Sequence, residues 1–382
     1  MKKDKSIFKV LPVLFGFFIM GFVDVVGIST NYVKQDFALS DTVANLLPLM
    51  LFLWFAVLSV PTGIIMNKIG RKNTVLISMG ITLLAMLVPL ISYSFPMILI
   101  TFSLLGIGNT ILQVAMNPLV SNVVSKDRLT SSLTLGQFIK AIAAFLGPII
   151  AAASAVSLGN WRFIFPIFAG ITVISGFWLI ITPIHEEQVS NPTSSFSGCF
   201  NLLKDKTILM FFLGIIFAVG LDVGLNTAIP KFLIERCNIS LEKAGLGISL
   251  YFIARTIGTF LGAILLIKID GRIFFLVNML IAIPVMILML LTANLIVILT
   301  TVFLLGLLVA NVFSIIFSAA LKKEPERANE IAGLLVMGIA GGAVLPLLMG
   351  IVSDNLGQTA GMALLLAAFF YLLFNAFKME KS

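Results

Sequence analysis

Apolar residues occupy this chain in long runs that are separated by short polar intervals. An α-helix needs about 20 consecutive apolar residues to cross the hydrocarbon core of a bilayer. The runs are apolar at nearly every position, whereas the strands of a membrane barrel alternate between polar and apolar residues. Twelve runs are long enough, at approximately 8–33, 43–66, 73–94, 96–124, 131–155, 161–184, 207–231, 241–266, 273–292, 294–320, 330–353 and 357–377. The pattern therefore predicts an all-α membrane protein with twelve transmembrane helices.

Composition and charge agree with this prediction. Hydrophobic residues make up 59% of the chain and charged residues 11%, against about one quarter charged in soluble domains. With the N-terminus in the cytoplasm, 18 of the 25 Lys and Arg residues fall in cytoplasmic segments and five in outer segments. Because basic residues accumulate on the cytoplasmic side, we expect both termini there, in a bacterial cytoplasmic (inner) membrane. The formal charge of +8 thus reflects the basic residues of the cytoplasmic segments. We expect a lipid bilayer as partner and no nucleic acid.

The longest polar interval, 185–206, has linker composition and divides the runs into six and six. The two halves match at a nearly constant offset of 198 to 200 residues, in the pairs Asp24-Val25 with Asp222-Val223, Leu104-Leu105-Gly106 with Leu304-Leu305-Gly306, and Pro148 with Pro346. Both halves begin in the cytoplasm, so the repeats are predicted to be parallel, related by an axis along the membrane normal. We expect one six-helix bundle over 1–184, a cytoplasmic linker over 185–206, and a second bundle over 207–382.

A basic segment framed by glycines follows the second apolar run, with Gly63, Asn67, Gly70, Arg71 and Lys72 at fixed spacing. It resembles the loop motif G-x-x-x-D-R-x-G-R-R/K of the major facilitator superfamily, with Asn in place of the usual Asp. That superfamily also uses two parallel six-helix repeats, so the resemblance covers essentially the whole chain. It implies the major facilitator fold and transport by alternating access, with this loop taking part in the conformational change. A merely basic inner loop is the simpler alternative for the segment itself.

Four further segments are similar to the sugar–proton symporter family typified by the L-fucose, glucose and galactose permeases. They are QVAMNPLV at 113–120 (family E-T-A-A-N-P-F-V), LTLGQFIK at 133–140 (L-N-L-A-Q-x-F-N), GLDV at 220–223 (G-A-E-V) and LLVMGIAGGAVLP at 334–346 (L-L-V-M-x-I-x-G-G-A-x-x-P). The resemblance implies a sugar as substrate and a proton as coupling ion. Gln113 stands where the family has a Glu implicated in coupling, Lys140 replaces an Asn, and Asp24 lies one turn before the family's first-helix acid. These departures leave the substrate open.

Two acids lie inside predicted spans, Asp24 in the first and Asp222 in the seventh. A charge at the bilayer centre costs at least about 2.5 kcal/mol, so such residues normally face a bundle interior or a watery cavity. Burial also favours the protonated form of a carboxyl group, which suits reversible protonation during transport. We therefore predict that both acids couple transport to a cation, with H⁺ expected and Na⁺ as the alternative. A structural salt bridge or hydrogen bond is the competing interpretation.

Two bases lie inside spans as well, Lys140 in the fifth and Arg255 in the eighth. We predict that they contact substrate, because a cation can bind the carboxylate of a sugar acid. The alternative is permanent pairing with the two acids, which would favour a neutral sugar. Amides on the same kinds of helix are predicted to bind sugar hydroxyls, with helix–helix hydrogen bonding as an equal alternative: Gln113, Asn117, Gln137, Asn226 and Asn311.

Several function classes are excluded by what the sequence lacks. The single histidine, His185, lies in the central interval, so no histidine triad or zinc site is expected within the membrane. No G-x-x-x-x-G-K-[ST] run exists for nucleotide hydrolysis. We expect no enzyme activity, no metal and no cofactor. The sequence predicts a monomeric secondary transporter that imports a monosaccharide or sugar acid, a small-molecule substrate, by cation symport. Proton-coupled export of drugs or other metabolites is the alternative.

Overall fold

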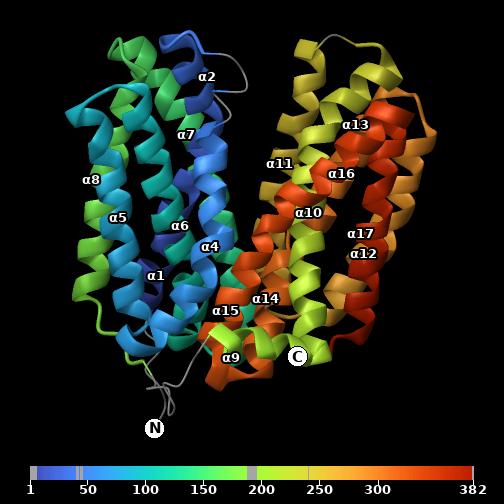
Figure 1. Ribbon diagram of the computed structural model, residues 1–382. Helices are drawn as coiled ribbons and strands as arrows, with labels where there is room; N and C mark the ends of the chain where they lie inside the picture. The colour runs from blue at the N-terminus through green and yellow to red at the C-terminus, as the bar shows by residue number, and fades with distance from the viewer. Residues whose placement is uncertain (1–6, 40–42, 44–45, 187–195, 240, 381–382) are drawn as a thin grey trace. The chain divides into compact units, whose positions relative to one another are not determined.

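The computed structural model describes residues 7–39, 43, 46–186, 196–239 and 241–380, which form helices and no strand (Figure 1). The elements are α1 (Ile7–Met20), η1 (Gly21–Val25), α2 (Val26–Asp36), α4 (Leu46–Ile69), α5 (Arg71–Ile91), α6 (Phe95–Val123), η2 (Lys126–Arg128), α7 (Leu129–Ser157), η3 (Trp161–Phe163), α8 (Ile164–Ile181), α9 (Phe196–Asn201), η4 (Leu202–Lys204), α10 (Lys206–Cys237), α11 (Leu241–Leu265), α12 (Gly271–Leu291), α13 (Leu295–Val309), α14 (Val312–Lys323), η5 (Pro325–Arg327), α15 (Ala328–Met337), η6 (Gly338–Ala340), α16 (Gly341–Leu356) and α17 (Gln358–Lys378). Here η denotes a 3₁₀ turn.

Twelve stretches of the described chain are long and apolar enough to cross a membrane, which confirms the predicted all-α architecture. Their outward faces keep large apolar side chains exposed, as Ile174, Phe177 and Ile181 on α8 illustrate. Lipid is the medium in which such a surface is stable. The seventh helix is longer than predicted, because α10 continues past 231 to Cys237 and ends at Asn238 in the left-handed conformation.

The chain divides into two compact units. Unit 1 holds Met1–Leu129, Gly136–Asn201 and Glu324–Met337, and unit 2 holds Thr130–Leu135, Leu202–Lys323 and Gly338–Ser382. Part of the predicted linker, 187–195, lies outside the described residues. The division into bundles over 1–184 and 207–382 stays a prediction.

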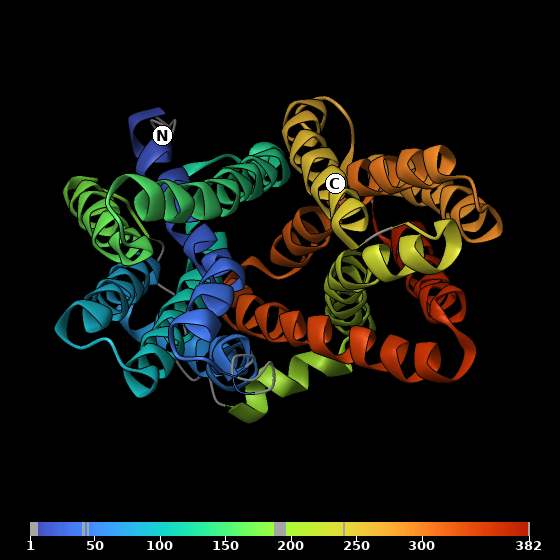
Figure 2. The same ribbon diagram turned by 90° about the horizontal axis from the view of Figure 1, so that it is seen from above.

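Unit 1 is built on α6, against which α1, α4, α5 and α15 pack. From above, the blue first span lies among green and teal helices of the same unit (Figure 2). Glycine permits the closest contacts: a β-carbon at Gly106 of α6 would collide with the backbone of Leu51 on α4. A β-carbon at Gly63 of α4 would lie 2.6 Å from the Asn329 carbonyl oxygen on α15. Backbone contact of this kind lets van der Waals packing hold membrane helices together.

Unit 2 is built on α10, which packs against α11, α14, α16 and α17. Small residues again set the spacing. A β-carbon at Gly220 of α10 would lie 2.8 Å from Leu345 Cβ, and one at Gly341 of α16 would lie 2.5 Å from the Ile216 carbonyl oxygen. This close packing brings α16 near the α10 segment that carries Asp222.

Three spans are interrupted rather than continuous, which the apolar runs did not predict. The first span changes to a 3₁₀ turn at Gly21–Val25, the tenth breaks between Val309 and Val312, and the eleventh changes at Gly338–Ala340. A break inside a membrane helix leaves backbone groups that need new partners, and it often marks a functional position. Asp24 lies in the first of these interruptions.

Candidate functional site

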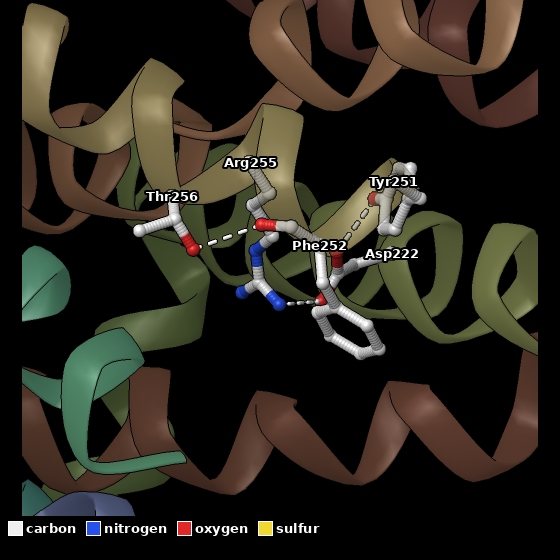
Figure 3. A network of polar contacts seen from close by, with 5 residues as sticks. All are labelled: Asp222, Tyr251, Phe252, Arg255 and Thr256. Atoms are coloured by element: carbon white, nitrogen blue, oxygen red, sulfur yellow. Dashed lines mark hydrogen bonds and ion pairs between the residues drawn. The ribbon is translucent and has the colours of Figure 1, made fainter. Parts of the chain in front are cut away.

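In unit 2, α10 and α11 bring an acid, a base and a phenol together (Figure 3). Asp222 Oδ2 lies 2.9 Å from Arg255 Nη1, and the Tyr251 hydroxyl donates a hydrogen bond of 2.7 Å to Asp222 Oδ1. Tyr251 and Arg255 are four residues apart on α11, so they share one face of the helix. Each carboxylate oxygen of Asp222 therefore has a fixed partner from the same face of α11.

Burial differs across this cluster. Tyr251 is fully buried, whereas the side chains of Asp222 and Arg255 keep 22% and 38% of their exposed area. A buried phenol normally requires a hydrogen-bond partner, and Asp222 supplies it. The tyrosine thus anchors the carboxylate, while the side chains of the ion pair remain partly exposed. Guanidinium and carboxylate groups are strong, directional partners for hydroxyl groups.

In unit 1, the interruption that carries Asp24 is supported by a ladder of amides on α6. Asn109 Nδ2 donates to the carbonyl oxygen of Met20 at 2.7 Å, at the junction of α1 and η1. Gln113 Nε2 donates to Asn109 Oδ1 at 2.8 Å, and Asn117 Nδ2 donates to the Gln113 carbonyl oxygen at 2.9 Å. All three amides are buried. Their hydrogen bonds satisfy a carbonyl at the break, which keeps η1 stable in an apolar surrounding.

The same interruption lies against α7. A β-carbon at Gly21 would lie 2.6 Å from both the Lys140 carbonyl oxygen and Ala143 Cβ, and one at Gly147 would lie 3.5 Å from Val25. The first and fifth spans therefore run side by side in the same direction, and η1 meets α7 at the level of Lys140. The side chain of Asp24 is exposed and that of Lys140 is half-buried. One acid and one base thus lie on neighbouring segments of unit 1.

The remaining predicted amides fall into two groups. Asn311 is buried at the break of the tenth span, packs on Gly262, and donates to the Gly258 carbonyl oxygen at 2.9 Å. Gln137 on α7 and Asn226 on α10 are half-buried, and their side chains make no hydrogen bond within the part of the chain that the structure describes. Asn226 lies four residues after Asp222 on α10, so it shares that face. Gln137 and Asn226 therefore have the hydrogen-bonding capacity that a ligand needs.

The loop motif contacts α15 within unit 1. Asn67 Nδ2 donates to Glu330 Oε1 at 3.1 Å, and Asn329 Nδ2 donates to Asn67 Oδ1 at 2.6 Å. Arg71 Nε donates to Asn329 Oδ1 at 2.7 Å, and Arg71 Nη1 donates to Asn122 Oδ1 at 2.7 Å. Asn67 replaces the usual Asp of the motif, and the carboxylate comes instead from Glu330 on α15. Asn67 thus both donates to and accepts from α15.

The same loop is capped from the central interval. Gly70 has φ +84° and precedes the first turn of α5. The carboxylate of Glu186 accepts hydrogen bonds from the backbone N–H of Arg71 at 2.6 Å and of Lys72 at 2.7 Å. Lys72 Nζ donates to the carbonyl oxygens of Ile180 and Thr182 at the end of α8. A carboxylate at a helix N-terminus satisfies unpaired donors and complements the helix dipole.

Pairing of Arg255 with an acid was the alternative drawn from the sequence, whereas the other partners of these residues were missed. Tyr251 is detectable in hindsight, because it lies one turn before Arg255 on the same helix face. Glu330 and Glu186 carried no signal, because they lie in sequence 263 and 115 residues from their partners Asn67 and Arg71. Within the described residues, no group of three or more His, Cys, Asp or Glu side chains is arranged to hold a metal.

Residues 13–335 match the Major Facilitator Superfamily. The chain is 24% identical over 383 residues to the glucose/galactose transporter of Brucella abortus biovar 1 (strain 9-941), covering 96% of this chain and 92% of that protein. Its fold is similar to the crystal structure of the E. coli fucose:proton symporter FucP, with a TM-score of 0.86, 17% identity, and coverage of 98% and 99%. It is also similar to the proton:xylose symporter XylE, with a TM-score of 0.76, 12% identity, and coverage of 98% and 96%. The resemblance stated from the sequence is thereby confirmed.

Proposed function

This chain belongs to the Major Facilitator Superfamily and is an integral membrane transport protein rather than an enzyme, and we propose that it imports a neutral monosaccharide by symport with a proton. The observation that carries the choice of substrate is the ion pair between Asp222 and Arg255. Because the carboxylate already compensates the charge of the guanidinium, an anionic substrate is not needed to do so. A sugar hydroxyl can add to this pair without disturbing its charge balance.

The relatives support the same substrate class. One is named as a glucose/galactose transporter, and the two solved structures are named as a fucose:proton and a proton:xylose symporter. All four named sugars are neutral. At 24% identity or less, the relatives indicate a class of substrate and leave the individual sugar to be measured.

We assign sugar contact in unit 2 to Asp222, Asn226 and Arg255. Asp222 and Asn226 share one face of α10, and Arg255 faces them from α11. In unit 1 we assign it to Gln137 and Lys140, which lie three residues apart on α7 and therefore share a face. Sugars need paired donors and acceptors, which amides, carboxylates and cations supply. We assign no direct sugar contact to Gln113, Asn117 and Asn311, because their amides are buried and hydrogen-bonded to neighbouring groups.

We assign proton coupling to Asp24. Asp222 has both carboxylate oxygens engaged by Arg255 and Tyr251, so protonating it would disrupt a fixed cluster. Asp24 lies in a 3₁₀ interruption at the level of Lys140, and its side chain is exposed. Because its side chain is exposed, a proton can reach this carboxyl group and leave it again. Na⁺ in place of H⁺ is the alternative that an ion-substitution experiment decides.

The loop motif is proposed to stabilise one conformation of the transport cycle. The hydrogen bonds of Asn67 join α4 to α15 in unit 1, and that of Arg71 joins α5 to α15. Alternating access requires contacts that form in one state and break in another. We propose that this contact is one of them, and that the protein works as a monomer.

Uptake into liposomes that contain the purified protein tests the proposal. An inward proton gradient should drive accumulation of D-glucose, D-galactose or L-fucose above equilibrium, and a protonophore should abolish it. Sugar acids and lipophilic cations serve as competing substrates. The proposal is wrong if only sugar acids accumulate, if only lipophilic cations move, or if a Na⁺ gradient drives uptake and a proton gradient does not.

A further inference from the structure

Unit 1 contains a polar cavity at the end away from the loop motif. Helix α5 begins beside that motif at Arg71 and ends at Ile91, so Tyr93 lies at the opposite end of the unit. A cavity of about 540 Å³ opens there. Its polar and aromatic lining comes from the end of α2, the connection between α5 and α6, and the segment after α7: Tyr32, Asp36, Tyr93, Asn160, Trp161 and Arg162.

The carboxylate of this cavity, Asp36, is held through one of its two oxygens. Asp36 Oδ2 accepts a hydrogen bond of 2.5 Å from the Tyr93 hydroxyl and one of 3.0 Å from Trp161 Nε1. Burial, reinforced by Asp36, raises the pKa of Tyr93 above its usual value, so the phenol stays protonated and keeps donating. Asp36 Oδ1 makes no hydrogen bond within the described residues. The carboxylate is thus fixed in position with one oxygen left to accept.

The base of the cavity is fixed in a similar way. The guanidinium carbon of Arg162 lies 4.3 Å from the centroid of the Tyr93 ring, and Arg162 Nε donates to Asn160 Oδ1 at 2.9 Å. Its terminal nitrogens make no hydrogen bond within the ranges that the structure covers. Ring stacking and one hydrogen bond therefore orient the guanidinium, while its outer donors stay available.

Aromatic rings complete the lining. Tyr32 and Trp161 are stacked, with centroids 5.0 Å apart and planes inclined by 10°. Tyr93 meets Trp161 edge to face at 6.5 Å. Trp161 is almost fully buried, and Tyr32 is half-buried and contributes to the cavity wall. An apolar ring surface beside a carboxylate and a guanidinium suits a ligand with one apolar face and several hydroxyl groups.

We propose that this cavity is an outer binding site for the pyranose ring of a neutral sugar, a site separate from the residues assigned to transport. A sugar hydroxyl would donate to Asp36 Oδ1, another would accept from Arg162, and the C–H face of the ring would lie on Tyr32. Asp36 and Arg162 together carry no net charge, so the cavity gives no net electrostatic preference to an anion or a cation over a neutral polyhydroxyl ligand.

The position of the cavity suits a site that binds incoming sugar before the sugar reaches the transport site. Asp36 lies twelve residues beyond Asp24 along the first span, and Ala155 lies fifteen beyond Lys140 along α7. At 1.5 Å per residue these separations are roughly 18 and 22 Å. Both sites are therefore carried by the same two spans yet are far enough apart for two sugars to bind at once. This inference rests on the proposed function, since it takes the substrate to be a monosaccharide.

Trp161 can report binding directly. The chain has three tryptophans, so Trp54→Phe with Trp178→Phe leaves Trp161 as the only one. Titration of this variant with D-galactose, D-glucose and L-fucose should change its fluorescence saturably, while mannitol, an open-chain polyol, should not. In this background Arg162→Gln should raise the half-saturating sugar concentration by about tenfold, the loss of a charged hydrogen bond. Arg236→Gln, which removes another half-buried arginine, is the matched control and should leave it unchanged.

Two further variants separate this site from the transport site. Arg255→Gln should preserve the Trp161 response, because the outer site does not use unit 2. Gln35→Phe places a ring on an exposed residue that lines the cavity, so it should abolish the response without touching the Asp36 cluster, even if Arg162→Gln fails to fold. A Trp161 response that persists in Gln35→Phe or disappears in Arg255→Gln overturns the outer site. Uptake without any Trp161 response refutes this site alone, whereas a Trp161 response without uptake refutes the transport proposal alone.

Discussion

Asp24 and Asp222 occupy matching positions in the two halves of the chain, yet their surroundings differ. Asp222 lies in the uninterrupted helix α10, where Arg255 and Tyr251 engage both of its oxygens. Asp24 lies in a 3₁₀ turn that buried amides of α6 support, and its side chain is exposed. An internal repeat can therefore keep the position of an acid while the backbone that carries it differs. Asp222 is held in a charge pair, and proton exchange at Asp24 is our proposal.

The loops after the second and eighth spans show a similar divergence. In unit 2, Asp270 caps its own helix α12 by accepting hydrogen bonds from the backbone N–H of Arg272 and Ile273. In unit 1, Gly70 occupies the position before α5, and the cap comes from Glu186, 115 residues away in sequence. The cap of the first loop therefore comes from the central interval, whereas the cap of the second loop comes from the residue next to its own helix.

The largest effect is expected from removing the charge of Asp24. Asp24→Asn cannot take up a proton, so sugar should equilibrate across the membrane instead of accumulating. Exchange of labelled for unlabelled sugar should persist, because the sugar contacts remain. Proton-driven uptake and counterflow in liposomes measure the two activities, and unchanged accumulation would remove Asp24 from coupling.

A smaller but specific loss is expected from breaking the ion pair of unit 2. Arg255→Gln leaves Asp222 with Tyr251 alone and should weaken binding of neutral sugar by about 1.5–3 kcal/mol, the range for hydrogen bonds to charged groups. Isothermal titration measures the change. The double variant Asp222→Asn with Arg255→Gln should recover thermal stability lost in either single variant, because no charge is then left unpaired. Additive losses of stability would contradict the pairing.

Replacement of Lys140 distinguishes a neutral sugar from a sugar acid as substrate. If unit 1 contacts a neutral sugar, Lys140→Asn should leave the charge selectivity of the protein unchanged and alter sugar affinity only modestly. If the substrate is a sugar acid, the same change should weaken its binding by about 1.5–3 kcal/mol. Parallel titrations with D-galactose and D-galacturonate distinguish the two outcomes, with Lys231→Asn as the control for loss of one cation.

The two loops should respond differently to loss of their caps. Asp270→Ala and Glu186→Ala each remove a side chain that satisfies two backbone N–H groups, at a cost of about 0.5–2 kcal/mol. Asp270→Ala should speed hydrogen exchange at Arg272 and Ile273, in the first turn of α12. Glu186→Ala should speed hydrogen exchange at Arg71 and Lys72 and also at Thr182 after α8, because Glu186 and the Lys72–Thr182 contact join that segment to α5. Equal and local exchange in both variants would contradict this difference.

The smallest expected effect is a pH-dependent change at Cys199 on α9, which packs against α15 and α4. Burial, with a contribution from the charge of Glu330, raises the pKa of this thiol to about 11. The neutral thiol is therefore favoured on folding, so its contribution to stability is full below pH 9 and is lost as the pH rises toward 11. Thiol alkylation in a Cys237→Ser background should be slow at pH 8 and rise with pH. Asn67→Ala should accelerate it by loosening α15.

The sequence determined the architecture because a membrane limits what a chain can do. Runs of about 20 apolar residues must be helical in a bilayer, so the twelve spans followed from run length alone. The family followed from local motifs, since residues such as Gly63, Gly70 and Arg71 keep their spacing within one loop. The presence of charges inside spans also followed from the sequence, because a charged residue is visible in an apolar run wherever its partner lies.

Only the tertiary structure decided what those residues do. Gln113, Asn311, Gln137 and Asn226 are alike as amides in apolar helices, but the first two are buried in hydrogen bonds to neighbouring groups and the last two are not. The interruption at Gly21–Val25 depends on Asn109, 89 residues away from Met20. Apolar periodicity records which residues avoid water, but it carries no information about which polar groups from distant helices will meet. That pairing is set by the packing of the helices, and it places Arg255 and Tyr251 against Asp222.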